Sequence, residues 1–237
     1  MAGLPWSRER RVARRRDRLV GQAPPGALRD CLSAALPSFD TPVTQVPARA
    51  VDLETTGLDP RRDVILSIGY VPLDGLTIRL GGAGYRVVAQ ADSGLAAGGV
   101  GQSATVHGLT DDVVAAGVPL AQAIEELLVA LRGRILLAHF DSIERDFIAA
   151  ACRSLYGVDL PLTSIDTLEL QRRIVGGPEG HVGAGALRLA VARDHLQLPR
   201  YRAHDALTDA LACAELYLAQ VARLSGGEPL PLRRVVG

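Results

Sequence analysis

Two acidic residues interrupt an apolar stretch in the run Val51-Asp52-Leu53-Glu54, which continues as Thr55-Thr56-Gly57. Side chains alternate between the two faces of a β-strand, so Asp52 and Glu54 should project from the same face. Neighbouring carboxylates repel each other unless a cation lies between them, and oxygen ligands suit Mg²⁺ or Mn²⁺. The pattern favours a divalent-metal site over the alternative, a polar strand end where both acids meet water.

A second group stands much later in the chain, in the run His204-Asp205-Ala206-Leu207-Thr208-Asp209. Five helical residues turn through about 500°, so His204 and Asp209 cannot share one helical face. The spacing predicts that His204 lies on a loop, that Asp205 caps the helix and that Asp209 lies one turn inside it. His204 and Asp209 could then reach one cleft. The alternatives are a surface histidine, an Asp205 that only caps, which we favour, and an Asp209 that only stabilises the helix dipole.

A third group, His139-Phe140-Asp141-Ser142-Ile143-Glu144, stands where a further helix should begin. Asp141 and Glu144 have the spacing of a capping box, in which two side chains satisfy the free N–H groups of a helix start. Glu144 could therefore serve helix formation instead of chemistry, or serve both.

The elements that must position these groups alternate between strands and helices from residue 48 onward. Apolar periodicity and turn residues predict strands at 48–54, 63–73, 84–90, 134–139 and from 163, and helices at 119–131, 142–156, 185–196 and 205–223. This order predicts an α/β fold with a mixed sheet flanked by helices. Residues 1–47 are expected to form an Arg-rich helical extension (helix over 7–35) and a proline linker, 48–223 the main domain, and 224–237 a disordered tail.

Composition limits the classes of protein that this chain can represent. All basic residues are arginine, and 26 of them balance 26 acidic residues, which argues against a broad basic footprint for nucleic acid. The chain has no apolar run of the ~20 residues that a membrane span needs, and its start does not look like a secretory signal. Cys31, Cys152 and Cys213 lie far apart, which predicts buried thiols in a reducing cytoplasm.

The three groups, in their order along the chain (52–58, 139–144 and 204–209), resemble the motifs of the DnaQ-like (DEDDh) 3′–5′ exonuclease superfamily, which includes the proofreading subunit of bacterial DNA polymerase III. The run from Asp52 to Leu58 matches the first family motif, and His204 with Asp209 matches the third. His107-Gly108-Leu109-Thr110 resembles a further family feature. The middle motif departs from the family pattern, because Phe140 stands at the usual asparagine position and Glu144 at the usual aspartate position. Asp141 and Asp146 are fallback candidates that do not fit the family spacing.

The resemblance implies a ribonuclease H-like fold and hydrolysis assisted by two Mg²⁺ or Mn²⁺ ions. Asp52 would bind both ions, Glu54 and Asp209 would complete the first, and Glu144 would support the second. His204 would act as the general base, a role that the ordinary histidine pKa suits near neutral pH. Substrate contacts are implied for Thr55, Thr56, His107 and His139.

The implied substrate is the 3′ end of single-stranded DNA or RNA, with a polymerase or regulatory protein as a further partner and no membrane. Little in the sequence reads a 2′-hydroxyl, so an RNA or oligoribonucleotide exonuclease remains an alternative. A catalytically weakened exonuclease fold that binds nucleotides or a protein is a second, favoured by Glu144 and by the neutral net charge. A phosphohydrolase built on the His204-Asp205 pair is a distant third. The Arg-rich helix could steer nucleic acid, or be a solvated helix or a docking arm.

Overall fold

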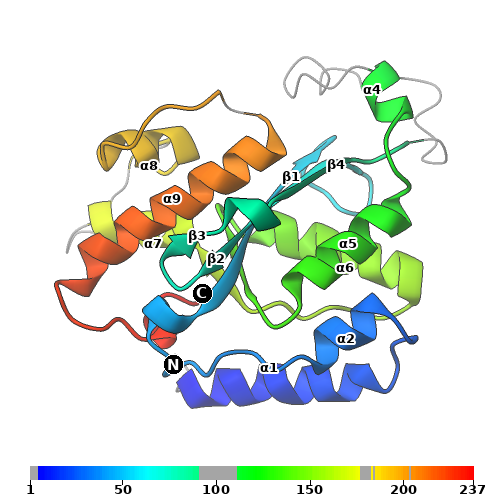
Figure 1. Ribbon diagram of the computed structural model, residues 1–237, viewed down its shortest axis with the longest axis horizontal. Coiled ribbons are helices and arrows are strands. Elements are labelled where there is room, and N and C mark those ends of the chain that lie inside the picture. Colours follow the sequence, from blue (N-terminus) through cyan, green and yellow to red (C-terminus); the bar gives the residue numbers. More distant parts are fainter. Residues whose placement is uncertain (1–4, 91–110, 177–182, 184, 203) are drawn as a thin grey trace.

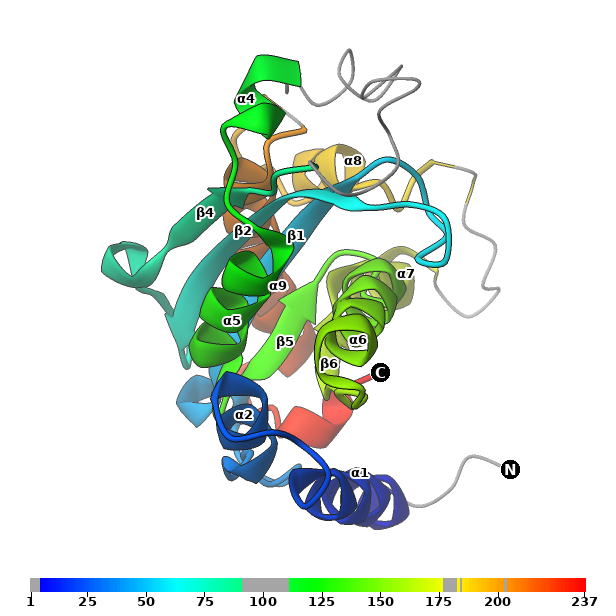
Figure 2. The same ribbon diagram turned by 90° about the vertical axis from the view of Figure 1, so that its right-hand side faces the viewer.

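The computed structural model describes residues 5–90, 111–176, 183, 185–202 and 204–237, and within them a six-stranded sheet lies between two helical layers (Figures 1 and 2). The strands are β1 (Pro47–Thr55), β2 (Ile65–Asp74), β3 (Thr77–Ile78), β4 (Gly84–Val87), β5 (Ile135–Ala138) and β6 (Ser164–Asp166). The helices are α1 (Pro5–Val20), α2 (Ala27–Ser33), α4 (Asp111–Ala115), α5 (Leu120–Leu131), α6 (Ser142–Tyr156), α7 (Thr167–Val175), α8 (Leu189–His195) and α9 (Ala206–Ser225). None of these helices is long and apolar enough to cross a bilayer.

The sheet is mixed, as the sequence predicts. Its order is β3-β2-β1-β5-β6, with β4 also paired to β2. The pairs made by β2 are antiparallel, whereas β1 runs parallel to β5 and β5 runs parallel to β6. The parallel pairs require crossover helices, which α5 and α6 supply. The expected α/β class is therefore confirmed.

The central strand β1 separates two apolar clusters. Val51 and Leu53 pack in the cluster built from α2, α5 and α6. Ala48 and Ala50 point the other way, into the cluster that contains the inner face of α9. Because side chains alternate along a strand, the residues that continue the α9 face are those at positions 52 and 54. The alternation that builds the core thus directs two acids toward the start of α9.

The N-terminal extension differs from the single helix expected over 7–35. It forms α1 and α2, separated by a turn that contains Pro24 and Pro25, because proline lacks the N–H that a helix interior needs. Leu28 and Leu32 of α2 are buried in the same cluster as α5 and α6. The extension therefore shares one hydrophobic core with the chain that follows it.

The expectation of a disordered tail is wrong. Leu230, Leu232 and Val235 are buried with the inner face of α9, and the 3₁₀ turn η4 (Leu232–Arg234) holds the last residues together. The backbone N–H of Leu232 donates to Thr41 O at 2.9 Å, and Val236 forms a bridge to Ile165 of β6. The apolar side chains among the prolines of this segment supply enough buried area to fix it.

Candidate active site

The end of β1 carries the first two candidate ligands. Asp52 pairs with Gly69 of β2 and Glu54 pairs with Ser67, and the register shifts directly after Glu54. Glu54 is 6% exposed although it carries a carboxyl group. The two acids thus lie on one face, as the alternation predicts, at the point where the strand leaves the sheet.

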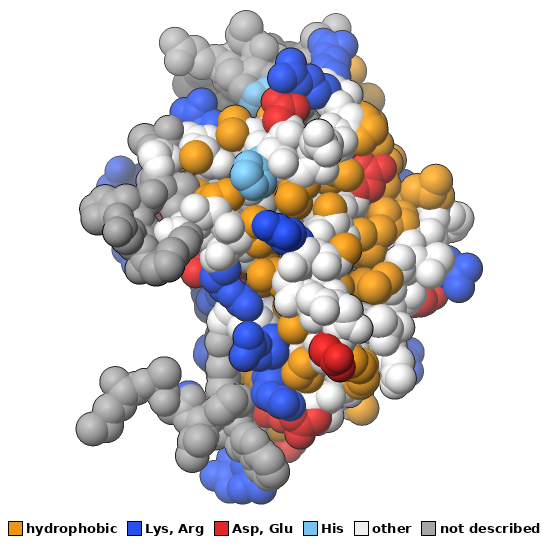
Figure 3. All heavy atoms as spheres, turned by 90° about the vertical axis from the view of Figure 1, so that its left-hand side faces the viewer, with side chains coloured by type: hydrophobic (Ala, Val, Ile, Leu, Met, Phe, Trp, Pro, Cys, Tyr) orange, Lys and Arg blue, Asp and Glu red, His pale blue; other side chains and the backbone are white. Residues whose placement is uncertain are grey.

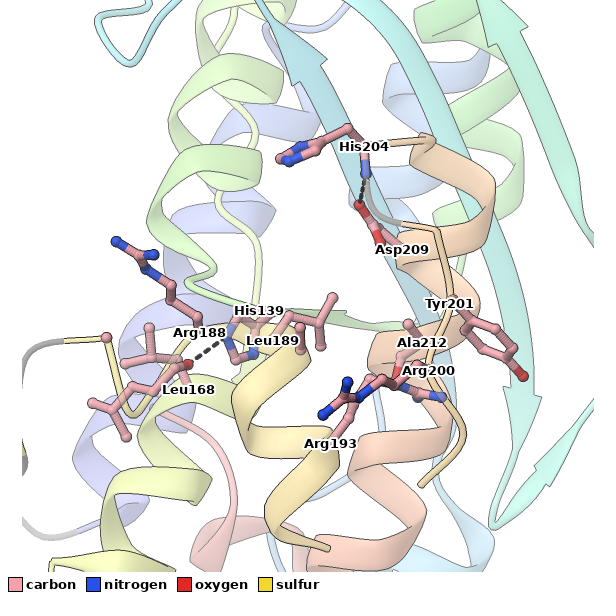
Figure 4. Close-up of a pocket in the computed structure, with 13 residues that line it drawn as sticks. His139, Leu168, Arg188, Leu189, Arg193, Arg200, Tyr201, His204, Asp209 and Ala212 are labelled. Atoms are coloured by element: carbon pink, nitrogen blue, oxygen red, sulfur yellow. Dashed lines mark hydrogen bonds between the residues drawn. The ribbon is translucent and has the colours of Figure 1, made fainter. Parts of the chain in front are cut away.

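The start of α9 faces this strand end and has the local structure that its sequence predicts. Asp205 is the N-cap residue, and its Oδ1 accepts a hydrogen bond from the Thr208 N–H at 2.8 Å. Asp209 lies one turn inside the helix, and its Oδ2 accepts from the backbone N–H of His204 at 2.8 Å. His204 has φ +69°, a left-handed conformation that costs a non-glycine residue energy and is concentrated at functional sites. The Asp209 carboxylate holds this loop in place (Figure 4).

Gly69 allows α9 to lie directly on the sheet. Gly69 is on β2, where it pairs with Asp52 of β1. A Cβ atom at Gly69 would lie 2.1 Å from the backbone carbonyl carbon of Ala206. A side chain at this position would therefore push the first turn of α9 outward. The absent side chain sets how closely His204 and Asp209 approach β1.

Three side chains from these two segments converge on one point. Glu54, His204 and Asp209 each offer one ligand atom, and these atoms lie within 4.8 Å of one another. The two carboxylate oxygens are the ligands that Mg²⁺ or Mn²⁺ prefers, and the imidazole stands beside them. The donor atoms and their spacing therefore fit a metal ion.

Glu144 lies at the buried end of α6 and does not cap it. The side chain is 4% exposed, and its Oε2 atom has no hydrogen-bond partner among the described residues. Asp141 occupies the N-cap position, but its side chain makes no capping hydrogen bond; it accepts from the Ser164 hydroxyl and from Arg145 Nη1 at 3.3 Å. The capping-box hypothesis is wrong, because the Asp141 side chain accepts hydrogen bonds from Ser164 and Arg145 and none from the N–H groups of the helix start. Asp146 is exposed on the outer side of α6, away from Glu54 and Asp209.

The electrostatics of the site follow from the crowding of four acids. Burial, reinforced by the charges of Glu144, Glu54 and Asp209, raises the pKa of Asp52 well above its ordinary value. Burial and the charge of Asp209 raise the pKa of Glu54 to about 7, and burial raises the pKa of Glu144 to about 8. The pKa of Asp209 is also raised by burial, against the opposing effect of the His204 N–H. The repulsion among these carboxyl groups is reduced either when some of them are protonated or when a cation binds between them.

The metal-free protein should lose stability as the pH rises from about 4.5 to about 8. An unfolded glutamate ionises near 4.5, whereas folded Glu54 and Glu144 keep their protons until about 7 and about 8. In this window the folded state binds more protons, so the free energy of unfolding falls with pH, by about 1.4 kcal/mol per pKa unit at most. Urea unfolding in EDTA at pH 5 and pH 8 measures this difference.

The variant Glu144→Gln is the control for that pH dependence. It removes one titrating group, so its free energy of unfolding should vary less with pH than that of the original protein. Adding Mg²⁺ at pH 8 should restore stability to the original protein, because an ion that binds only the folded state stabilises it. Equal or greater stability at pH 8 than at pH 5 in EDTA would contradict the crowding of acids described above.

The side chains expected to contact substrate are largely engaged within the protein. The Thr55 hydroxyl donates to Gly57 O at 2.6 Å. The Thr56 N–H donates to Val64 O at 3.1 Å, and its hydroxyl donates to Asp63 at 3.1 Å. Those groups build the turn after β1, and the substrate contacts implied for Thr55 and Thr56 stay a prediction. His107 lies outside the described residues.

His139 is also held by hydrogen bonds within the protein, and its implied substrate contact stays a prediction. Its Nδ1 lies 2.9 Å from Thr167 Oγ1 and its Nε2 lies 2.8 Å from Leu187 O. Burial lowers the pKa of the ring to about 4, so the imidazole stays neutral. His139 thereby ties β5 to the chain before α8, and it forms one wall of a cavity of about 620 Å³ that His204 and Asp209 also line (Figure 4).

Asp166 is the residue near the site that the sequence motifs miss. It ends β6 and caps α7, and its Oδ1 accepts from the N–H groups of Leu168 and Phe140, each at 2.9 Å. Its charge helps to raise the pKa of Glu144. In the sequence, Asp166 and Thr167 stand between a predicted strand and a predicted helix. This pattern is typical of a helix N-cap and does not indicate an active-site residue. Asp166 holds the turn before α6 and so positions Glu144.

The comparisons with known proteins agree with this geometry. Residues 50–217 match the family model described as Exonuclease (RNase_T). The chain is 25% identical over 182 residues to a PolC-type DNA polymerase III of Thermotoga petrophila, covering 76% of this chain and 12% of that protein. It is 28% identical to a DNA polymerase III subunit epsilon-like protein of Rhodobacter capsulatus, covering 76% of this chain and 24% of that protein. It is 24% identical to the DNA polymerase III epsilon subunit of Treponema pallidum, covering 73% of this chain and 75% of that protein. The chain thus spans far less than two thirds of the first of these relatives.

Solved structures share the fold. The nuclease domain of 3′hExo, a DEDDh family member bound to rAMP, superimposes with a TM-score of 0.60 at 16% identity, covering 86% of this chain and 98% of that one. E. coli Exonuclease I in complex with a dT13 oligonucleotide superimposes with a TM-score of 0.60 at 14% identity, covering 77% of this chain and 43% of that one. Exonuclease X in complex with 5′ overhanging duplex DNA gives 0.57 at 20% identity, covering 80% and 99%. These similarities confirm the ribonuclease H-like fold.

Proposed function

Since the chain belongs to the Exonuclease (RNase_T) family and is a nuclease of the DnaQ-like type, we propose that it removes nucleotides from the 3′ end of single-stranded DNA or RNA and releases nucleoside 5′-monophosphates. The observation that carries the proposal is the convergence of Glu54, His204 and Asp209, whose ligand atoms lie within 4.8 Å of one another. Relatives whose names include a DNA polymerase and neighbours bound to DNA or to rAMP support the substrate class.

The acids of the site would hold two Mg²⁺ or Mn²⁺ ions. Glu54 and Asp209 would supply oxygens on one side, Asp52 is close enough for the charges of both and of Glu144 to raise its pKa, and the unpartnered Oε2 of Glu144 would provide a buried acceptor. When bound, these ions supply positive charge that stabilises the pentacoordinate phosphorus and the leaving oxygen. Their charge would also lower the raised pKa values, so that all four carboxyl groups are ionised at neutral pH.

His204 would act as the general base. In the proposed step its imidazole takes a proton from a water molecule, the water oxygen bonds to phosphorus, and the bond from phosphorus to the 3′ oxygen of the preceding nucleotide breaks. Asp209 positions this histidine by accepting its backbone N–H at 2.8 Å. Asp205 and Gly69 act further out, by fixing the first turn of α9.

The experiment that tests the proposal digests DNA and RNA oligonucleotides of equal sequence side by side. We expect stepwise shortening of a 5′-labelled strand in Mg²⁺ or Mn²⁺, with nucleoside 5′-monophosphates as products, and no shortening in EDTA. A strand blocked by a 3′-terminal phosphorothioate linkage should persist as the control. Unchanged digestion in EDTA would exclude the mechanism.

A weakened exonuclease fold that only binds nucleic acid is the second candidate. Glu144 favours it, because the family usually has aspartate at this position and active sites tolerate about 0.5 Å of displacement. The same assay separates the two candidates, since a binding module would retain the strand on a filter in Mg²⁺ without shortening it. A polymerase partner and a cytoplasmic location remain part of the proposal; three free, buried cysteines are consistent with the latter.

A further inference from the structure

A groove lined by arginine side chains lies between α1 and α6. It has a volume of about 390 Å³, and its charged lining comprises Arg11 and Arg15 of α1, Arg145, Asp146 and Arg153 of α6, and Asp159. Four guanidinium groups thus face two carboxyl groups, in a protein whose formal net charge is +0. The charged side chains of the groove therefore carry an excess of positive charge. Arginine side chains also gather on another face of the molecule, beside scattered acidic side chains and wide apolar areas (Figure 3).

Helix α1 is a fixed wall of this groove. Arg16 of α1 is buried, and its Nη2 donates to the backbone carbonyls of Cys31 and, at 3.3 Å, of Ala34. Leu19 and Val20 pack against the main apolar cluster. Figure 2 shows α1 at one end of the molecule, with α6 above it. The buried Arg16 shows that α1 is packed against the protein and is not a free solvated helix. Its outer arginines therefore have fixed positions along the groove.

The other wall is α6, whose first turn also carries Glu144. Arg145, Ala149 and Arg153 follow one another at intervals of four residues and so lie along one stripe of α6. Arg145 directly follows Glu144, whose side chain faces the acid cluster. At 1.5 Å per residue the stripe from 145 to 153 extends about 12 Å. The groove therefore starts at the turn of α6 that carries Glu144 and runs along the outer side of that helix.

The arginines retain donors for a ligand. Arg145 is bonded to Asp141 at 3.3 Å, while Arg153, at 3.0 Å, and Arg15 share Asp159. The side chains of Arg15 and Arg153 are 57% and 54% exposed. A guanidinium carries five N–H donors, so each can keep its ion pair and still bind a phosphate oxygen. On α1 the exposed Arg10, Arg14 and Arg18 add positive charge beside the groove.

We propose that this groove binds the sugar–phosphate backbone of the nucleic-acid strand whose 3′ end lies in the active site, a proposal that rests on the nuclease function proposed above. The side chains offer positive charge and N–H donors and few groups suited to reading bases, so binding is independent of sequence. A strand long enough to reach α1 binds more tightly than one that fills the active site alone.

The triple variant Arg11→Gln, Arg15→Gln, Arg153→Gln tests the groove. Binding of a fluorescent 20-nucleotide strand is followed by anisotropy in EDTA, so that no hydrolysis is needed, at several NaCl concentrations. We expect the dissociation constant to rise about tenfold or more. In a plot of the logarithm of the dissociation constant against the logarithm of the NaCl concentration, the slope should fall by about 2, because each of the three lost phosphate contacts contributes about 0.7 on a single strand. A trinucleotide, too short to reach α1, should bind both proteins equally.

The matched control substitutes three exposed arginines outside the groove, Arg132→Gln, Arg172→Gln and Arg223→Gln, which changes the net charge equally. It should bind the 20-nucleotide strand like the original protein, and the melting temperatures of both variants show that they fold. Equal binding by the groove variant, or equal weakening by the control variant, overturns the proposal and leaves an acidic protein as the occupant to seek. Tight, groove-dependent binding without digestion in Mg²⁺ would refute the nuclease function and support the groove.

Discussion

Replacing Asp52 by asparagine should lower the rate of 3′-terminal hydrolysis by at least about 10³-fold. Metal-assisted stabilisation of the transition state contributes several kcal/mol, and about 1.4 kcal/mol corresponds to a factor of ten. The charges of Glu144, Glu54 and Asp209 all raise the pKa of Asp52, and in the proposed mechanism Asp52 would bind both ions. Asparagine keeps the shape of the side chain but loses the charge that would hold them.

The same substitution should leave the metal-free protein as stable as before or more stable. The raised pKa of Asp52 means that its ionised form opposes folding at neutral pH, and asparagine removes that charge. Thermal unfolding in EDTA at pH 7.5 measures this, and the rate is measured on a 5′-labelled strand in Mg²⁺. Asp30→Asn, on the exposed side of α2, is the matched control and should change neither quantity. A rate within tenfold of the original would remove Asp52 from the proposed chemistry.

The two ends of the site could be predicted from local sequence because local geometry determines them. The period of two along a strand places Asp52 and Glu54 together whatever the rest of the fold does, and β1 has this alternation. Helix capping separates His204 from Asp209 in the same way, and Asp205 caps α9 as expected. In both segments a short-range rule is sufficient.

Glu144 shows where local rules are insufficient. The interval from Asp141 to Glu144 fits a capping box, yet Ser164 and Arg145 bind Asp141, and Glu144 turns inward. Both arrangements are compatible with the same spacing, and the hydrogen bond from Ser164, which is distant in sequence, cannot be read from it. Asp166 was missed for the same reason, since a helix cap and a residue that supports an active site look alike in one sequence. The packed tail depends on apolar residues whose partners lie far away along the chain.

Gly69 is a positioning residue that no motif marks, and Gly69→Ala should reduce the hydrolysis rate by about 10²-fold. The added Cβ would lie 2.1 to 2.3 Å from backbone atoms of Ala206 and Leu207, so the first turn of α9 must move. A shift of about 1 Å in catalytic groups costs about 10²-fold in rate. His204 and Asp209 would move away from Glu54, and overpacking should also lower the free energy of unfolding by about 1–3 kcal/mol.

Three comparisons separate this positioning effect from a loss of folding. Rates are measured far below the melting temperature of the variant, where the folded population is complete. Gly81→Ala is the matched control, because a Cβ there meets nothing within 4 Å, and it should keep both rate and stability. Adding Ala206→Gly to Gly69→Ala should restore little, since the obstructing atoms belong to the backbone and not to the Ala206 side chain. Full activity in Gly69→Ala would mean that the approach of α9 to β1 does not set the geometry of catalysis.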